Sequence, residues 1–307
     1  MGKKIMAETV AETIRKITKK HIDNGKGFVI GQCLTAVGWV QNTIPKQTKG
    51  IIELPMTDTA GMGTAVGASI VGSRPIIVLR FQSFLWLNSS PLVMHAAKAK
   101  EIFGYGAPVF VRAIASEANY GQGPLHGNNY HSPFIHMPGL KVCAPLTPQE
   151  YKKIWSKYLK DDSPYLVSEH RNSYKSSREF RNKYNKKAKV TIFAISAARF
   201  NALKALEILE KKKIFCNLIN IIWLSPFKIS KREIEALEQT KRGLVIDSSY
   251  TDCGITTTIA YKLMQLTKAK VVALGLENRS SGSSKKTENG TPSAKKIAKT
   301  IEKLINS

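Results

Sequence analysis

The sequence is poor in cysteine and in acidic residues, and it contains no long apolar run. No stretch approaches the ~20 consecutive apolar residues of a membrane helix, and the first residues lack the apolar core of a signal peptide. Its four cysteines form no C-x-x-C pair: Cys33, Cys143, Cys216 and Cys253. We therefore expect neither a disulfide framework nor a zinc site, and no membrane association. A cytoplasmic location is the default prediction.

The charge balance is strongly basic, with 47 Lys and Arg against 22 Asp and Glu and a formal net charge of +25. Such an excess can mark a nucleic-acid binder. Here the basic residues are scattered or pooled in two polar segments, Arg171–Lys189 and Lys285–Lys303, without any RNP, zinc-finger or helix-turn-helix pattern. The charge therefore indicates a solvated basic surface, which an acidic partner subunit would suit, and no nucleic-acid partner.

The first part of the chain alternates strand-length apolar segments with segments of helical periodicity. The predicted strands are Gly27–Gly31, Ile51–Leu54, Arg74–Phe81, Pro108–Ala115, Leu140–Ala144 and Tyr165–Ser168. The predicted helices are Met6–Lys20, Thr57–Val71, Leu85–Ile102 and Pro148–Leu159. Strands separated by helices imply a parallel sheet with helices on its faces.

The alternation stops at the polar segment Arg171–Lys189 and then restarts. The second set of predicted strands is Val190–Ser196, Ile214–Ile221, Gly243–Asp247 and Lys270–Leu274. The second set of helices is Arg199–Lys211, Lys231–Gln239, Gly254–Leu266 and Pro292–Leu304, the last capped by Thr291 or Ser293. We therefore predict two three-layer α/β domains with largely parallel sheets, residues 1–172 and 189–307, joined by a linker at 173–188.

Several nucleotide and hydrolase signatures are absent: there is no Walker A loop, no G-x-S-x-G elbow, and no G-x-G-x-x-G spacing after a strand. Polar and aromatic residues instead follow predicted strands, where ligands of open α/β sheets gather. Asp58 suits this position, although an acid that begins a helix also suits the helix dipole. Phe84 could equally be a core residue. His126 lies in a loop rich in Gly and Asn, which favours function, whereas His131 and His136 are weaker candidates.

Seven short motifs follow one another in a specific order and spacing. They are Leu54–Gly67 (LPMTDTAGMGTAVG), Gly72–Pro75, Phe81–Phe84, Leu125-His126, Met137–Val142, Leu224–Pro226 and Thr291–Ala294. Together they resemble the β subunits of the E1 components of 2-oxo acid dehydrogenases, in the transketolase-like group of thiamine diphosphate enzymes. The resemblance covers nearly the whole chain and implies a pyrimidine-binding domain followed by a transketolase C-terminal-like domain.

The resemblance also implies roles for single residues. Asp58 matches a glutamate that hydrogen-bonds N1′ of the cofactor's aminopyrimidine and favours its reactive tautomer. Phe84 matches the residue that stacks on this ring, and Met56 matches a position whose backbone meets it. His126 matches a histidine that faces the substrate and transfers protons. We therefore expect Asp58 and His126 to be catalytic, and Met56, Asp58 and Phe84 to bind the cofactor.

Half of such a site is missing from this chain. In the family a G-D-G…N motif holds the diphosphate through a divalent metal, and no Gly-Asp-Gly occurs here. The resemblance implies that thiamine diphosphate is shared with an α-type subunit that carries this motif and Mg²⁺, in an α2β2 heterotetramer. No metal ligand is expected on this chain. A lipoyl acyltransferase is a further possible partner.

The sequence departs from the family pattern at several positions. Asp58 is shorter than glutamate by one methylene, about 1.5 Å, and Gly31-Gln32-Cys33 stands where Gly-Glu-Asp is usual. Two alternatives therefore stay open. One is the C-terminal half of a split transketolase, although the strings A-E-Q-N and E-D-G-x-T-H of that family are missing and the spacing from His126 to Pro138 fits E1 β subunits. The other is a degenerate, non-catalytic partner subunit.

Overall fold

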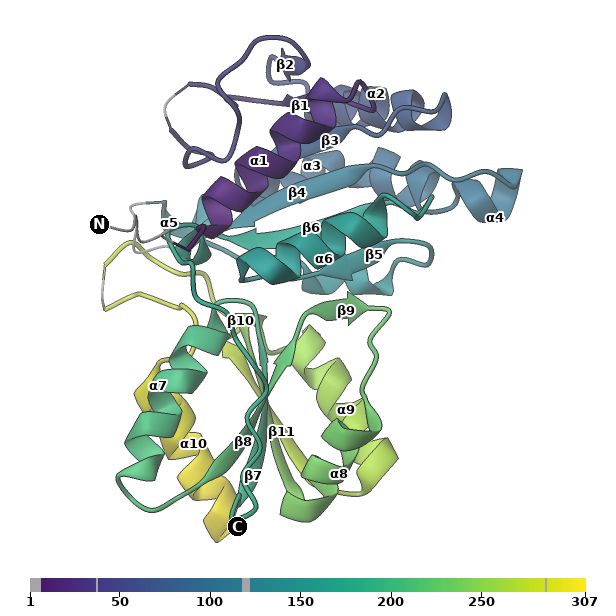
Figure 1. Cartoon of the computed structure of the whole chain (residues 1–307). Coiled ribbons are helices and arrows are strands. Elements are labelled where there is room, and N and C mark those ends of the chain that lie inside the picture. The colour runs from purple at the N-terminus through teal and green to yellow at the C-terminus, as the bar shows by residue number, and fades with distance from the viewer. Residues whose placement is uncertain (1–6, 37, 118–121, 285) are drawn as a thin grey trace, which may run out of the picture. The chain divides into compact units, whose positions relative to one another are not determined.

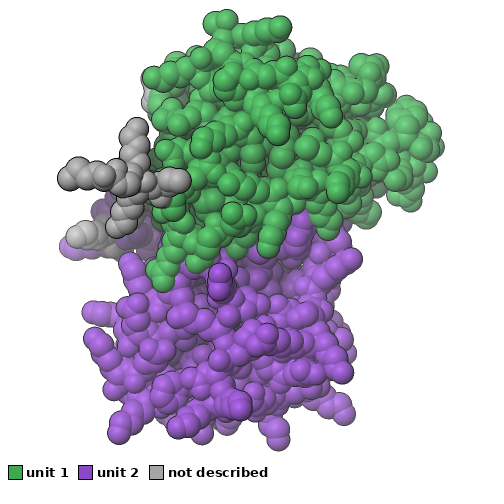
Figure 2. All heavy atoms as spheres, viewed as in Figure 1, with its two compact units in different colours: residues 1–115, 137–179 green, residues 116–136, 180–307 purple. Residues whose placement is uncertain are grey.

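The computed structural model describes residues 7–36, 38–117, 122–284 and 286–307. The chain divides into two compact units, which Figure 2 colours separately. Unit 1 comprises residues 1–115 and 137–179, and unit 2 comprises residues 116–136 and 180–307. Residues 116–136 thus belong to unit 2 although both flanking segments belong to unit 1. The linker limits of 173 and 188 stay a prediction.

Unit 1 is built on a sheet whose central strands are buried at every position, as in parallel sheets covered on both faces. The strands are β1 (Val29–Gly31), β2 (Ile51–Glu53), β3 (Ile76–Leu79), β4 (Phe110–Ala115), β5 (Lys141–Cys143) and β6 (Tyr165–His170). They follow the order β2-β1-β3-β4-β6-β5, and each neighbouring pair is parallel. The longer helices are α1 (Val10–Asp23), α2 (Asp58–Ile70) and α6 (Pro148–Tyr158).

The single helix predicted for residues 85–102 is wrong. Three elements replace it: α3 (Leu85–Ser90), a π-helical turn (Pro91–Ala96) and α4 (Ala99–Phe103). Pro91 has no N–H, so it cannot bond the carbonyl of Leu87, and its ring crowds that carbonyl. The hydroxyl of Thr59 on α2 donates to the Leu87 oxygen instead, at 2.6 Å. The break therefore ties α3 to the first turn of α2.

Unit 2 has a four-stranded parallel sheet in the order β11-β10-β7-β8. The strands of this sheet are β7 (Val190–Ile195), β8 (Cys216–Ile221), β10 (Arg242–Tyr250) and β11 (Lys270–Leu276). A short strand, β9 (Trp223–Ser225), was not predicted and lies outside this sheet. Its helices are α5 (Gly123–His126), α7 (Ala198–Glu210), α8 (Lys231–Thr240), α9 (Ile255–Thr267) and α10 (Ala294–Asn306). In Figure 1, α7 and α10 cover one face of this sheet, and α8 and α9 cover the other.

The two parallel-sheet α/β domains predicted from the sequence are confirmed. The observed ends of helices and strands differ from the predicted ends by a few residues. Capping side chains set where several of the helices begin. Ser293, one of the two predicted caps, begins α10 by accepting a hydrogen bond from the Lys296 N–H at 3.2 Å. Among the described residues, no helix combines the length and apolarity that crossing a bilayer requires.

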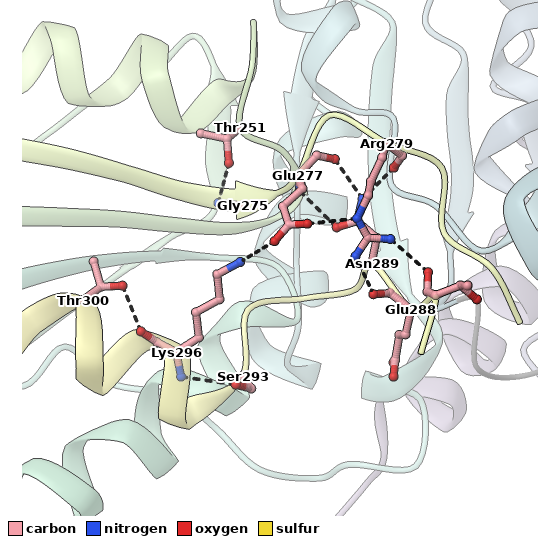
Figure 3. Close-up of polar contacts among 10 residues, drawn as sticks. Thr251, Gly275, Glu277, Arg279, Glu288, Asn289, Ser293, Lys296 and Thr300 are labelled. Carbon is pink, nitrogen blue, oxygen red and sulfur yellow. Dashed lines mark hydrogen bonds and ion pairs between the residues drawn. The ribbon is translucent and has the colours of Figure 1, made fainter. Parts of the chain in front are cut away.

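The polar loop between β11 and α10 is fixed by side-chain contacts (Figure 3). Asn289 donates to the carbonyls of Glu277 and Arg279, at 2.8 and 2.6 Å, and its side-chain oxygen accepts the Glu277 N–H at 3.0 Å. Glu277 also receives hydrogen bonds from Arg279 and Lys296, which hold the pKa of its carboxyl below the ordinary value. The loop is therefore closed at its base in spite of its many Ser and Lys residues.

Candidate functional site

Asp58 is the first residue of α2 and is half-buried. Its carboxylate lies at a helix N-terminus, where the backbone dipole favours negative charge. The side-chain N–H of Asn88 donates to its Oδ1 at 3.1 Å. Its Oδ2 accepts no hydrogen bond from the described part of the chain. One carboxylate oxygen is thus oriented, and the other is available to a ligand.

Asn88 is itself held in place. It is 1% exposed, and its Nδ2 also donates to the backbone carbonyl of Phe84, one turn earlier, at 2.9 Å. The amide therefore connects the Asp58 carboxylate to the backbone of Phe84. Asn88 was not predicted from the sequence. Its spacing of four residues from Phe84, which places both on one helical face, was the available signal.

A small pocket brings these residues together. Its lining is Gly31, Gln32, Leu54, Asp58, Ile77, Val78, Leu79, Arg80, Phe84 and Asn88. Most of these residues lie on or directly after β1 and β3, which are parallel neighbours. Ligands of open α/β sheets bind at the carboxyl ends of their strands. The structure thus brings Asp58 and Phe84, two of the sequence-predicted site residues, into one pocket at that edge.

The ring of Phe84 is fixed by a cluster of aromatic rings and a guanidinium group. The Arg80 guanidinium carbon lies 4.9 Å from the ring centroids of both Phe84 and Trp39. The ring of Phe81 lies 6.0 Å from Phe84 and 5.8 Å from Trp39. Arg80 is 8% exposed and donates to the side-chain oxygen of Gln32 at 3.2 Å. This cluster holds Phe84 as a flat apolar surface, since guanidinium and aromatic faces attract each other.

Met56 and His126 are not among the residues that line this pocket. The side chain of Met56 is 78% exposed, and it is not among the residues that line the pocket. The expected contact of its backbone with a cofactor stays a prediction. His126 ends α5, is half-buried and belongs to unit 2. The N–H of Gly127 closes this single turn on the Gly123 carbonyl at 3.0 Å.

The weaker histidines differ from each other. His136 is exposed, whereas His131 is fully buried and bonds Asp247 at 2.7 Å. His131 is thus a buried structural residue and His136 a surface residue, a difference that the sequence alone did not reveal. Among the described residues, no group of three or more His, Cys, Asp or Glu side chains could hold a metal ion.

The pocket has the chemistry of a site for a flat nitrogen heterocycle. An aromatic face can stack on such a ring, and a carboxylate oxygen can accept a hydrogen bond from a protonated ring nitrogen. Two family models match the chain in the corresponding order. The transketolase pyrimidine-binding domain matches residues 15–177, and the transketolase C-terminal domain matches residues 182–297. The chain therefore belongs to the transketolase family, whose first domain model spans more than half of it.

Three curated proteins of similar sequence are all β subunits by name. The β subunit of acetoin:2,6-dichlorophenolindophenol oxidoreductase from Cupriavidus necator is 28% identical over 242 residues, covering 75% of this chain and 71% of that protein. The β subunit of the pyruvate dehydrogenase E1 component from Rickettsia bellii is 28% identical over 282 residues, covering 85% of each. The 2-oxoisovalerate dehydrogenase β subunit of Bacillus subtilis is 26% identical over 229 residues, covering 68% of each. The resemblance to E1 β subunits is confirmed.

Solved structures show the same fold. A split-gene transketolase, solved as an inactive beta4 tetramer, superposes with a TM-score of 0.74 at 16% identity. The superposition covers 98% of this chain and 99% of that one. Transketolase from Campylobacter jejuni gives the same TM-score at 19% identity, and the match covers 96% of this chain and 46% of that enzyme.

Proposed function

We propose that this chain is the β-type subunit of a thiamine diphosphate-dependent 2-oxo acid decarboxylase or dehydrogenase, acting in the cytoplasm. The observation that carries the proposal is the pocket in which Asp58, Asn88 and Phe84 converge at the carboxyl edge of the unit 1 sheet. The names of relatives that cover most of the chain, which include pyruvate and 2-oxoisovalerate dehydrogenase subunits, support this reaction class.

The residues present fit the aminopyrimidine half of the cofactor. Phe84 offers a stacking face, and Asp58 Oδ2 has no hydrogen-bond donor among the described residues. Thiamine diphosphate, when bound, supplies a nucleophilic carbon for the 2-oxo group and an electron sink as CO₂ leaves. Asp58 would accept a hydrogen bond from the protonated ring nitrogen N1′ and so hold that proton. Asn88 would keep the carboxylate aimed, because it fixes Oδ1.

His126 is proposed to move protons on the substrate side. An imidazole titrates near neutral pH and can both donate and accept a proton at its ring nitrogens. Its place at the end of a one-turn helix in the glycine-rich loop suits a group that meets small substrates. Met56 is proposed to meet the pyrimidine through its backbone.

The proposed enzyme needs a second subunit. The chain has no Gly-Asp-Gly sequence, so a partner of α type would hold the diphosphate through Mg²⁺. We propose an α2β2 heterotetramer, with a lipoyl acyltransferase as a further possible partner.

The test is turnover by the purified complex of this chain with a co-expressed α-type subunit that carries Gly-Asp-Gly. Reduction of an artificial electron acceptor is measured with pyruvate, branched-chain 2-oxo acids, acetoin and xylulose 5-phosphate. The proposal predicts turnover of a 2-oxo acid that requires thiamine diphosphate and is lost in Asp58→Ala. Turnover of xylulose 5-phosphate alone would support a split transketolase instead, and cofactor binding without any turnover would indicate a degenerate subunit.

A further inference from the structure

Side chains at the carboxyl end of β10 form hydrogen bonds with the segment that follows His126. Four consecutive residues of β10, 247–250, each bond a side chain of the 128–132 segment. Asp247 pairs with His131 at 2.7 Å, and Ser248 accepts from Asn129 at 2.8 Å. The hydroxyls of Ser249 and Ser132 lie 3.0 Å apart, and the Tyr250 hydroxyl donates to Asn128 Oδ1 at 3.3 Å. We call this set of contacts the β10 clamp.

The clamp is buried and continuous with neighbouring elements. Asp247 and His131 are both 0% exposed, and Ser132, Ser248 and Ser249 are at most 6% exposed. The Ser132 hydroxyl also accepts the backbone N–H of Ile255, the first residue of α9, at 3.1 Å. This bond satisfies one of the donors that a helix N-terminus leaves open. The 128–132 segment is thus fixed against both a strand and a helix of unit 2.

The local backbone of β10 explains how four successive side chains can reach one segment. Pairing of β10 with β11 shifts register between Ile246 and Tyr250. Such bulges re-aim side chains at strand ends and occur beside active sites. The strand was predicted to end at Asp247 because the residues that follow, Ser248 and Ser249, are polar and continue no apolar run, whereas β10 extends to Tyr250.

The clamp reaches the helix that carries His126. The side-chain amide of Asn128 donates to the carbonyl of Pro124 in α5 at 2.5 Å, while its oxygen accepts from Tyr250. α5 has four residues, too few to hold its own geometry in water. Contacts with residues outside this helix therefore help to fix its position, and the clamp provides buried contacts of this kind.

The Asp247 carboxylate makes its contact with His131 a charge-assisted hydrogen bond. Burial alone would raise the pKa of Asp247, but the His131 charge and N–H, the Ser249 hydroxyl and the Ser248 backbone N–H hold that pKa below its ordinary value. A buried carboxylate is stable only when it is paired in this way. Its Oδ2 is bonded by both His131 and Ser249, whereas Oδ1 has no hydrogen-bond partner among the described residues.

We propose that Asp247 and His131 are positioning residues, which act through the β10 clamp to hold His126 in its working geometry. The expected effect on rate rests on the proposed function. The expected effect on the structure of residues 122–132 can be measured without turnover. Loss of the Asp247 charge would loosen residues 122–132, and displacement of a catalytic group by about 1 Å can lower the rate about 100-fold.

The experiment compares Asp247→Asn with Thr191→Val in the assembled complex. Thr191 is equally buried in the same sheet and bonds the Ala236 carbonyl at 2.9 Å, but it does not touch the clamp. Hydrogen exchange by mass spectrometry is the first measurement. Asp247→Asn should speed exchange at residues 122–132 about tenfold or more, the effect of losing one charge-assisted hydrogen bond. Thr191→Val should leave exchange in this segment unchanged.

The second measurement is a double-mutant cycle on kcat with His126→Ala. Asp247→Asn should lower kcat about 10- to 100-fold in the wild type and less than about 2-fold when His126 is absent. An equal loss in both backgrounds, or unchanged exchange in the segment, would overturn the inference. A complex with no turnover at all would count against the proposed function, while the exchange result would still decide the inference. If Asp247→Asn does not fold, the substitute variant is Asn129→Ala, which removes the bond to the Ser248 hydroxyl and the side-chain acceptor of the His131 N–H. It is held to the same exchange outcomes.

Discussion

The side-chain amide of Asn88 donates to Asp58 Oδ1 at 3.1 Å while it also bonds the Phe84 carbonyl at 2.9 Å. One buried amide thus connects the carboxylate and the aromatic residue of the candidate cofactor pocket. Since Asn88 lies on α3 and Asp58 on α2, the connection also crosses between helices. A second bond joins the same two helices: the Thr59 hydroxyl donates to the Leu87 carbonyl, which lacks a helical donor because Pro91 has no N–H.

Replacing Asn88 by Ala should lower kcat/KM for the 2-oxo acid about 10-fold, because the Asp58 carboxylate loses the donor that orients it. Ser89→Ala is the matched control, since the Ser89 hydroxyl bonds only the nearby Trp86 carbonyl among the described residues. Steady-state kinetics of the two complexes measure the difference. Equal rates in both variants would contradict the role assigned to Asn88.

Replacing Arg80 by Met should weaken binding of thiamine diphosphate about 3- to 10-fold. The variant removes a guanidinium that packs on Phe84 and Trp39 and bonds Gln32, so the stacking ring loses its support. Quenching of tryptophan fluorescence during cofactor titration measures the affinity. The control is Arg74→Met. It also removes a guanidinium that packs on an aromatic ring, 5.3 Å from the Tyr158 ring centroid, but Arg74 does not line the pocket. The control should keep its affinity, and a matching loss there would show a general effect on folding.

Replacing Glu169 by Gln should lower the free energy of unfolding by about 3 to 5 kcal/mol. Glu169 forms two hydrogen bonds with Arg112, at 2.7 and 2.9 Å, and both side chains are at most 2% exposed. The substitution leaves the buried guanidinium without a countercharge. Urea unfolding measures the loss, and Asp162→Asn, which breaks an exposed pair with Lys100, should cost less than about 1 kcal/mol. Similar losses in both variants would contradict the assignment.

Acid should remove the stability that Asp247 contributes. Its folded-state pKa is lowered, so its contribution is fully present above the unfolded value of about 3.9 and is lost as the pH falls through the folded value. The difference in unfolding free energy between wild type and Asp247→Asn should therefore be larger near pH 5 than below about pH 4. Urea unfolding at a series of pH values measures it. A difference that grows as the pH falls would have the wrong sign.

The sequence predicted the sheets well because buried parallel strands are short, continuous apolar runs. Ile76–Leu79 and Val190–Ile195 lie within predicted strands and are buried throughout. The helix over residues 85–102 failed because apolar periodicity continues through Pro91, while the missing N–H changes the hydrogen bonding there.

The site was predictable only in part. Asp58 and Phe84 lie in recognisable motifs and follow predicted strands. Their proximity at one edge of the sheet could therefore be expected. Asn88 and the β10 clamp depend on side chains from separate segments that meet only in the folded chain. Asn129 and Ser248, for example, are 119 residues apart in sequence. Polar residues of this kind show no periodicity that would reveal their partners.

The most direct test of the account is a crystal structure of the complex formed by this chain, its α-type partner and thiamine diphosphate with Mg²⁺. We predict that the aminopyrimidine stacks on Phe84, with N1′ about 2.7 to 3.2 Å from a carboxylate oxygen of Asp58. An aminopyrimidine bound elsewhere, with the Asp58 carboxylate turned to solvent, would contradict it.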